Sequence, residues 1–126
     1  MSGETILVVE DEGLIALHMT EVLEKAGYRV TDPAYSGEMA LRALETSPVP
    51  DLILMDIGLA GTLDGIETAR QIRKRFSIPL IFVTAYTSER MLERIHEVAP
   101  DGVLNKPFVD EELLALVGKA VGRGSA

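Results

Sequence analysis

The stretch ILVVEDE, residues 6–12, decides most of what this sequence predicts about its fold. It begins with a short apolar run without polar alternation, which is typical of a strand buried on both faces of a sheet. It ends in three acidic residues, and a helical pattern starts directly behind them. Because strands buried on both faces belong to parallel sheets, the stretch predicts a β–α unit whose strand ends in carboxylates.

The same unit recurs along the rest of the chain. Patterns that predict strands cover residues 6–9, 29–31, 52–55, 80–83 and 103–104, and patterns that predict helices cover residues 12–26, 37–46, 65–76, 88–99 and 109–121. Strict alternation of strands and helices requires right-handed crossovers and a parallel sheet with helices on both faces. The sequence therefore predicts an α/β fold, a flavodoxin-like doubly wound sheet of five strands in the order 2-1-3-4-5 with five helices.

Composition limits the classes of protein that this chain can belong to. With 126 residues, 47% of them hydrophobic, it suits one domain with a real core, which we place at residues 5–121 between flexible termini at 1–4 and 122–126. A net charge of −8 disfavours direct binding to nucleic acid or to anionic membranes. There is no cysteine, no apolar run long enough to span a bilayer and no signal peptide. We expect a cytoplasmic protein.

One basic cluster stands out against this acidic background. Arg70, Arg73, Lys74 and Arg75 lie within six residues of each other in the third predicted helix. Charges that are grouped in this way usually form a solvated helix face. We therefore do not predict a binding site there.

Polar residues stand where the predicted strands end. The first strand is followed by Glu10 and Asp11, the third by Asp56, the fourth by Thr84 and the fifth by Lys106. In a doubly wound sheet, ligands bind outside the carboxyl ends of the strands, at the point where strand order reverses. Each residue taken alone has an ordinary structural reading, but the fold brings them all to one edge.

The chemistry of this edge points to a metal and a phosphoryl group. Glu10, Asp11 and Asp56 repel one another unless a cation lies between them, and carboxylate oxygens suit Mg²⁺. A carboxylate beside Mg²⁺ is a competent nucleophile toward phosphorus. Lys106 supplies a positive charge for a phosphoryl oxygen, and the Thr84 hydroxyl supplies a hydrogen bond.

Four motifs together resemble those of bacterial response-regulator receiver domains. They are ILVVEDE (6–12), DLILMD (51–56), FVTA (82–85) and NKPF (105–108). Each motif is weak alone, but their order and spacing match the family from about residue 5 to residue 121. The resemblance implies a phosphorylatable switch of two-component signalling, a phosphoprotein that takes its phosphoryl group from a histidine kinase or a histidine phosphotransfer protein.

The resemblance assigns a role to each residue of the edge. Asp56 is the implied phospho-acceptor. Asp11, together with Glu10 directly or through water, is implied to hold Mg²⁺ with Asp56 and the backbone carbonyl of Gly58.

The resemblance also assigns the residues that respond to the phosphoryl group. Thr84 is implied to hydrogen-bond it and to move toward it, and Lys106 to pair with it. The bond between Lys106 and Pro107 is implied to be cis, which proline makes accessible.

This chain departs from the family pattern in several places. Glu10 stands where the family often has Asp, and Val103 stands where many receivers carry an aromatic residue that swings inward after phosphorylation. The loop 56–64 is one residue longer than usual and lacks its proline. Tyr86 is a candidate modulator that hinders the attacking water, and the alternative is that it simply packs on the adjacent loop.

The leading hypothesis is a switching module, not a turnover enzyme, whose chemistry is confined to phosphotransfer to itself and autodephosphorylation. We expect the signal at the surface formed by 88–99, 103–104 and 109–121, used for a downstream partner or a homodimer. One alternative is a receiver-like scaffold that needs no phosphate. Another is a Mg²⁺-dependent phosphatase, which is disfavoured because Gly58 stands where such enzymes keep an acid–base aspartate.

The sequence leaves the biological setting open. It does not name the kinase, the output pathway, the oligomeric state or the lifetime of the phosphate. We see no effector domain, so the chain is a stand-alone receiver, a relay, or a receiver taken from a longer protein, and these readings look identical in the sequence.

Overall fold

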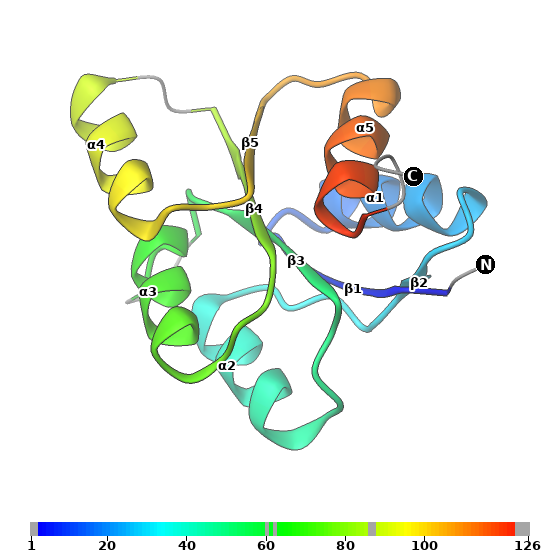
Figure 1. Cartoon of the computed structure of the whole chain (residues 1–126), viewed down its shortest axis with the longest axis horizontal. Coiled ribbons are helices and arrows are strands. Elements are labelled where there is room, and N and C mark those ends of the chain that lie inside the picture. The colour runs from blue at the N-terminus through cyan, green and yellow to red at the C-terminus, as the bar shows by residue number, and fades with distance from the viewer. Residues whose placement is uncertain (1–2, 60, 62, 86–87, 123–126) are drawn as a thin grey trace.

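The structure, a computed structural model, describes residues 3–59, 61, 63–85 and 88–122. Its strands are β1 (Thr5–Val9), β2 (Arg29–Val30), β3 (Leu52–Asp56), β4 (Leu80–Thr84) and β5 (Gly102–Asn105), and its helices are α1 (Gly13–Lys25), α2 (Gly37–Thr46), α3 (Gly65–Arg75), α4 (Glu89–Val98) and α5 (Asp110–Ala120). All strands pair in parallel in the order β2-β1-β3-β4-β5 (Figure 1). The predicted flavodoxin-like fold is confirmed.

The predicted elements are all present, and each end lies within one residue of its prediction. The differences that matter are at β3 and β4, which include Asp56 and Thr84 as their last residues. An apolar pattern stops at the first polar side chain, whereas the backbone ladder continues through it. Asp56 pairs with Val83 and Thr84 pairs with Asn105, so both side chains are fixed in the register of the sheet.

Helices cover both faces of the sheet (Figure 1). Helices α1 and α5 pack on one face, and α2, α3 and α4 pack on the other. Side chains of β1 alternate between the two layers, with Ile6 and Val8 in the α1–α5 core and Leu7 and Val9 in the opposite core. Strands whose side chains are buried on both faces of the sheet have unbroken apolar sequences, and this is why they could be predicted.

Gly65 allows α3 to start directly against the end of β3. A Cβ atom at Gly65 would lie 2.1 Å from the Asp56 carbonyl oxygen and 2.7 Å from the Ile57 Cα. The Gly65 N–H donates to the Ile57 carbonyl oxygen at 3.0 Å. The first turn of α3 is thereby held on the backbone that carries Asp56.

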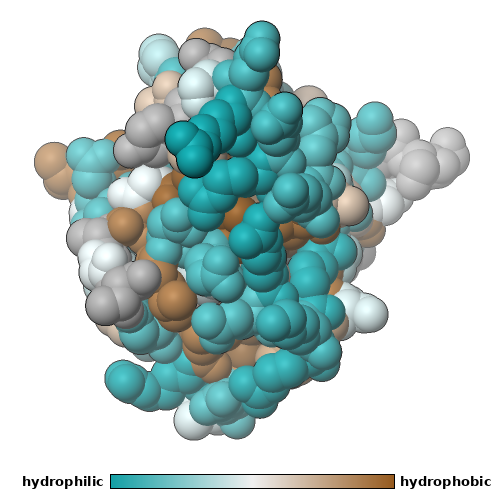
Figure 2. All heavy atoms as spheres, turned by 90° about the vertical axis from the view of Figure 1, so that its left-hand side faces the viewer, coloured by the Kyte–Doolittle hydropathy of each residue, from teal (hydrophilic) through white to brown (hydrophobic). Residues whose placement is uncertain are grey.

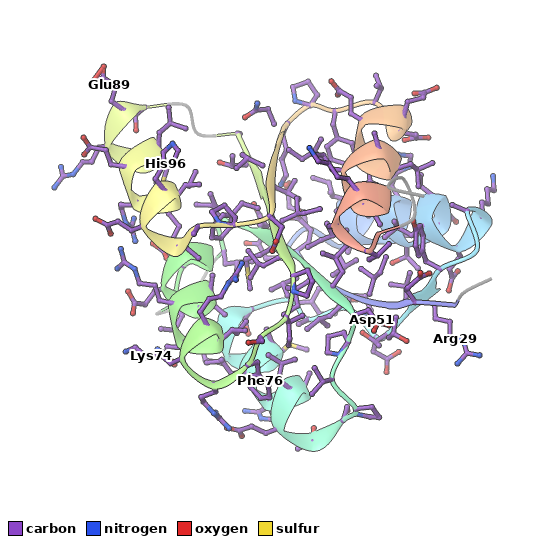
Figure 3. All side chains as sticks on the ribbon, in the orientation of Figure 1. Arg29, Asp51, Lys74, Phe76, Glu89 and His96 are labelled. Atoms are coloured by element: carbon purple, nitrogen blue, oxygen red, sulfur yellow. The ribbon has the colours of Figure 1, made fainter. Side chains whose placement is uncertain are left out.

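The basic cluster of α3 is engaged in ion pairs. Arg70 pairs with Glu97, Arg73 with Asp101 at 3.2 Å and Arg75 with Glu45 at 2.8 Å. Only Lys74 of the cluster points into solvent without an ion pair to a described residue (Figure 3). The prediction of a solvated helix face was therefore incomplete, because the acids that balance it come from distant parts of the chain.

Helix α4 rests on α3 at one end of the molecule (Figure 1). Ile95 and Val98 are buried in the core on that side, and Met91 packs against it. Figure 2 views the side formed by α3 and α4, where hydrophilic residues cover most of the surface. Within the described part of the chain, no helix has the length and apolar character needed to cross a membrane.

Candidate functional site

Asp56 ends β3 at the carboxyl edge of the sheet and is 6% exposed. Its Oδ1 atom accepts a hydrogen bond from the Gly58 N–H at 3.2 Å, and it lies 3.4 Å from the Lys106 Nζ atom. The Ile57 N–H continues the ladder to the Val83 carbonyl oxygen at 3.1 Å. The carboxylate is therefore held rigidly, with a cation on one side.

Glu10 lies deeper in the same pocket and is 1% exposed. Its backbone N–H donates to the Ala34 carbonyl oxygen at 2.9 Å, which fixes the end of β1. One carboxylate oxygen accepts from Lys106 Nζ at 3.0 Å, and the other accepts from the Glu12 N–H at 3.2 Å. The longer arm of Glu10, compared with Asp, thus reaches across the pocket to Lys106.

Burial sets the protonation of this pair of groups. It raises the pKa of Glu10 from an ordinary 4.5 to about 7, and the charge of Asp56 adds to the rise. For Lys106, burial acts to lower the pKa, but the hydrogen bond to Glu10 and the charges of Asp56 and Glu10 outweigh it and raise the pKa above 10.5. Lys106 therefore stays charged at neutral pH. The Glu10 carboxyl group, in contrast, loses its proton close to neutral pH.

Three carboxylates meet where the sequence predicted a metal. Glu10, Asp11 and Asp56 each offer an oxygen, and these oxygens lie within 4.8 Å of one another. Hard oxygen donors at this spacing fit Mg²⁺. Glu10 already binds Lys106 and the Glu12 N–H with its two oxygens. A contact between Glu10 and the metal through water would leave both of these hydrogen bonds in place.

Thr84 and Lys106 are joined through the backbone. Thr84 is 1% exposed, and its carbonyl oxygen accepts from the Lys106 N–H at 2.8 Å. The Lys106–Pro107 peptide bond is cis, as the sequence reading expected. The side chains of Asp56, Thr84 and Lys106 thus come from the ends of three adjacent strands, and all the predicted residues of this edge lie together.

The chain is similar in sequence and structure to known proteins. A family model described as response regulator receiver domain matches residues 6–118. The chain belongs to this family. Among curated relatives of the receiver, the transcriptional regulatory protein PdtaR of Mycobacterium tuberculosis is 31% identical over 94% of the chain, and the phyllosphere-induced regulator PhyR of Methylorubrum extorquens is 34% identical over 92%.

The receiver spans about half the length of these curated relatives, 57% of PdtaR and 43% of PhyR. Several solved structures match it along almost their whole length. The N-terminal domain of a response regulator from Carboxydothermus hydrogenoformans has a TM-score of 0.86 and 35% identity, over 94% of each chain.

A second solved structure bears on the metal. The receiver domain of the sensor histidine kinase PA1611 from Pseudomonas aeruginosa has a TM-score of 0.84 and 32% identity, over 96% of this receiver and 99% of that chain. It was solved with a magnesium ion coordinated in its active site cleft.

Three features that the sequence singled out have different outcomes in the receiver. Val103 is half-buried on β5 and packs against the core beneath α2, α3 and α4, so no aromatic ring occupies this position. Gly58 lies exposed beside Asp56, so its side of the pocket is open, as the sequence predicted. Tyr86, the proposed modulator, lies outside the described residues, as do positions 60 and 62 of the lengthened loop.

One apolar patch next to the site was not predicted from the sequence. Leu14 and Leu17 are 83% and 53% exposed on α1, which starts directly after the acidic triplet. A signal was present, because both leucines fall outside the stripe of Met19 and Leu23 that packs on the sheet.

One ion pair beside the loop that follows Asp56 was likewise not predicted. The Asp64 side chain caps α3 by accepting from the Glu67 N–H at 2.8 Å, and it pairs with Arg94 of α4 at 3.1 Å. Nothing in the sequence indicates this pair, because 30 residues separate its two partners.

Proposed function

We propose that this receiver accepts a phosphoryl group on Asp56, in the presence of Mg²⁺, from a histidine kinase or a histidine phosphotransfer protein. The observation that carries the proposal is the position of the Asp56 carboxylate, at the mouth of an acidic cluster and 3.4 Å from Lys106 Nζ. Because the phosphoryl group of a histidine kinase comes from ATP, we place this reaction in the cytoplasm.

In the proposed transfer, an Asp56 oxygen attacks the phosphorus of a phosphohistidine. The new O–P bond forms as the P–N bond breaks, and the electron pair leaves with the imidazole nitrogen. Mg²⁺, when bound, neutralises charge on the phosphoryl oxygens and on the carboxylates. Lys106, already beside Asp56, supplies a charge-assisted hydrogen bond to a phosphoryl oxygen.

Glu10 has a separate part in this proposal. Its hydrogen bond at 3.0 Å holds Lys106 in the pocket before the phosphoryl group arrives. An incoming phosphoryl oxygen competes with Glu10 for the same ammonium group. Autodephosphorylation removes the charge that the phosphoryl group adds. Water attacks the phosphorus, the acyl O–P bond breaks, and inorganic phosphate leaves.

The proposed output surface is formed by α4, β5 and α5. A phosphoryl group adds nearly two negative charges to the site. Thr84 ends β4 immediately before the connection to α4, so a movement of Thr84 reaches that helix first. Arg94 ties α4 to Asp64, the residue that caps α3 behind the acceptor loop. With Val103 in place of an aromatic ring, this contact between α3 and α4 is the route we favour.

The exposed leucines of α1 support a docking role for that helix. Leu14 and Leu17 stand beside the acidic pocket and offer apolar area to a partner that must bring a phosphohistidine close to Asp56. We propose that the kinase or phosphotransfer protein contacts this helix. A downstream protein partner or a second copy of the receiver uses the surface formed by α4, β5 and α5.

Two other functions are weaker candidates. A phosphatase needs an acid–base group near the nucleophile, and the residue two positions after Asp56 is Gly58. We therefore propose that the receiver has no substrate other than its own phosphoryl group. A scaffold that needs no phosphate has no use for Asp56, Glu10 and Lys106 packed in one buried pocket.

The test is intact mass after incubation with Mg²⁺ and acetyl phosphate. We expect a gain of one phosphoryl group in the wild type, dependent on Mg²⁺, and none in Asp56→Asn. The matched control is Asp51→Asn at the other end of the same strand, where Asp51 accepts a hydrogen bond from the Thr5 N–H at 2.8 Å. An adduct that persists in Asp56→Asn would show that another residue is the phospho-acceptor. No adduct in a wild type that binds Mg²⁺ would favour the scaffold.

A further inference from the structure

A groove of about 680 Å³ lies between α2 and the edge of the sheet at β2. Its walls are α2 and the two connections on either side of this helix, residues 31–34 and 47–50. None of the acidic residues of the acceptor site lines it. It is therefore a cavity that phosphotransfer leaves unused.

The local sequence explains why the groove is open. Only two residues of β2, Arg29 and Val30, pair with β1. Asp32 and Pro33 follow, and proline can neither donate to a sheet ladder nor leave its fixed φ. The regular ladder is therefore interrupted beside α2 and resumes only at the bridge between Val9 and Ala34. Met39 and Val49, which line the groove, remain 39% and 53% exposed.

The charge of the groove is opposite to that of the protein. Arg29 and Arg42 line it, against a single acidic lining residue, Asp32, in a chain with a net charge of −8. Neither arginine forms an ion pair with a described residue, whereas all four arginines at positions 70, 73, 75 and 94 do. Figure 3 shows the Arg29 side chain projecting from the β2 edge, away from the sheet.

The shape and the chemistry together suit a small molecule. Small-molecule sites are mostly apolar clefts of about 300–1,000 Å³ with a few polar groups that fix orientation. The groove has apolar lining from Leu7, Ala34, Met39 and Val49. A guanidinium group binds a carboxylate through two parallel hydrogen bonds. An added peptide strand suits the edge less well, because Pro33 and the two-residue β2 leave almost no ladder to extend.

We propose that this groove binds a small organic acid with an apolar body. The acid group lies on Arg29 or Arg42, and the apolar body lies against α2 and the connection 47–50. The groove reaches the acceptor edge through Ala34, whose carbonyl oxygen accepts from the Glu10 N–H. An occupant therefore contacts a segment that supports Glu10.

The test is a titration of the ¹⁵N-labelled receiver with 2-naphthoate and with its neutral counterpart 2-naphthamide, followed by amide chemical shifts. Neither Mg²⁺ nor a phosphodonor is present, so the outcome does not depend on the proposed phosphorylation. We expect 2-naphthoate to shift the amides of residues 31, 32, 34, 39–44, 47 and 49, with a millimolar or tighter dissociation constant. We expect 2-naphthamide to bind at least about fivefold more weakly.

Substitutions assign the charge effect to the two arginines. We expect Arg29→Gln and Arg42→Gln each to weaken 2-naphthoate at least about threefold, since each removes a charge-assisted contact. Arg90→Gln is the matched control, an exposed arginine on α4 that also lacks an ion pair to a described residue. Ala43→Phe places a ring in the groove and should abolish the shifts.

Several results would overturn the proposal. Equal binding of the acid and the amide would make the groove an unselective apolar surface, and equal loss in Arg90→Gln would make the charge effect general. Shifts confined to α1 or α4 would place the ligand elsewhere. Shifts of the groove amides that depend on protein concentration, without ligand, would make a second copy of the chain the occupant.

Discussion

Replacing Gly65 by alanine is the sharpest test of how the acceptor site is built. A Cβ atom at this position would lie 2.1 Å from the Asp56 carbonyl oxygen, and ordinary contact begins at 3.4 Å. The first turn of α3 must therefore retreat by about 1.3 Å, the difference between these two distances. The obstacle is backbone of the strand, which has no rotamer that moves out of the way.

The expected cost follows from the contacts that this retreat disturbs. Overpacking of a buried position costs about 1–3 kcal/mol. The hydrogen bond from the Gly65 N–H to Ile57, now 3.0 Å, is stretched as well, at about 1 kcal/mol. We expect Gly65→Ala to lose about 2–4 kcal/mol of unfolding free energy, which corresponds to roughly 8–16 °C in Tm for a domain of this size.

Gly13 provides a matched control. It is the first residue of α1, as Gly65 is of α3, but nothing lies within 4 Å of a Cβ atom built there. Gly13→Ala should be neutral or stabilise by up to about 1 kcal/mol, because alanine restricts the unfolded chain. Both glycines have negative φ, so backbone conformation does not separate the two substitutions.

The assay is urea unfolding of the three proteins followed by far-UV circular dichroism. A second measurement is acetyl phosphate labelling at a temperature where Gly65→Ala remains folded, where we expect slower labelling because the backbone of Asp56 has moved. If Gly65→Ala were as stable as Gly13→Ala, the close approach of α3 to β3 would not exist in solution. If Gly65→Ala were destabilised but labelled at the normal rate, the close approach of α3 to β3 would contribute to stability alone and not to phosphorylation.

Three further predictions concern the charged groups. The pKa of Glu10 is about 7 in the folded chain against 4.5 ordinarily, so its contribution to stability is fully present below pH 4.5 and is lost as the pH rises to about 7. In Mg²⁺-free urea unfolding, stability should therefore fall over this range by up to about 3 kcal/mol more in wild type than in Glu10→Gln. Mg²⁺ should raise the Tm more at pH 8 than at pH 6, because the metal competes with the proton on Glu10. Asp11→Asn should abolish most of this gain in Tm. An equal gain at both pH values would show that protonation of Glu10 does not affect metal binding. Asp64→Asn keeps the cap of α3 but removes the ion pair to Arg94, so it and Arg94→Gln should each cost under about 1 kcal/mol. Both should speed amide hydrogen exchange in α4, and the double variant should add nothing to either one.

The sequence predicted the fold because the signals that define it are local. The apolar runs at β1, β3 and β4 are unbroken, since each strand is buried on both faces. Gly37 and Thr46 bound α2 in the structure as they do in the pattern. The weaker pattern at 29–31 corresponds to β2, which is an edge strand of two residues.

The meeting of polar side chains at one edge of the sheet was equally predictable, for a topological reason. Parallel strands end at one edge, so polar residues that follow apolar runs must meet there. Asp56 and Lys106 are 3.4 Å apart, as their positions behind the third and fifth apolar runs suggested. The hydrogen bond between Glu10 and Lys106 could not be predicted, because it depends on how far the longer side chain reaches across a folded pocket.

Sequence by itself therefore determined the order of the elements, the two-sided sheet and the residues gathered at its carboxyl edge. Tertiary structure alone decided which charges neutralise each other, as in Arg94 with Asp64. It also decided which apolar residues remain outside the core, as with Leu14, and where the edge at β2 leaves a groove. The physical reason is that burial patterns and strand ends depend on residues that are adjacent in the sequence. Ion pairs, exposed leucines and cavities instead depend on distances between segments that only packing brings together.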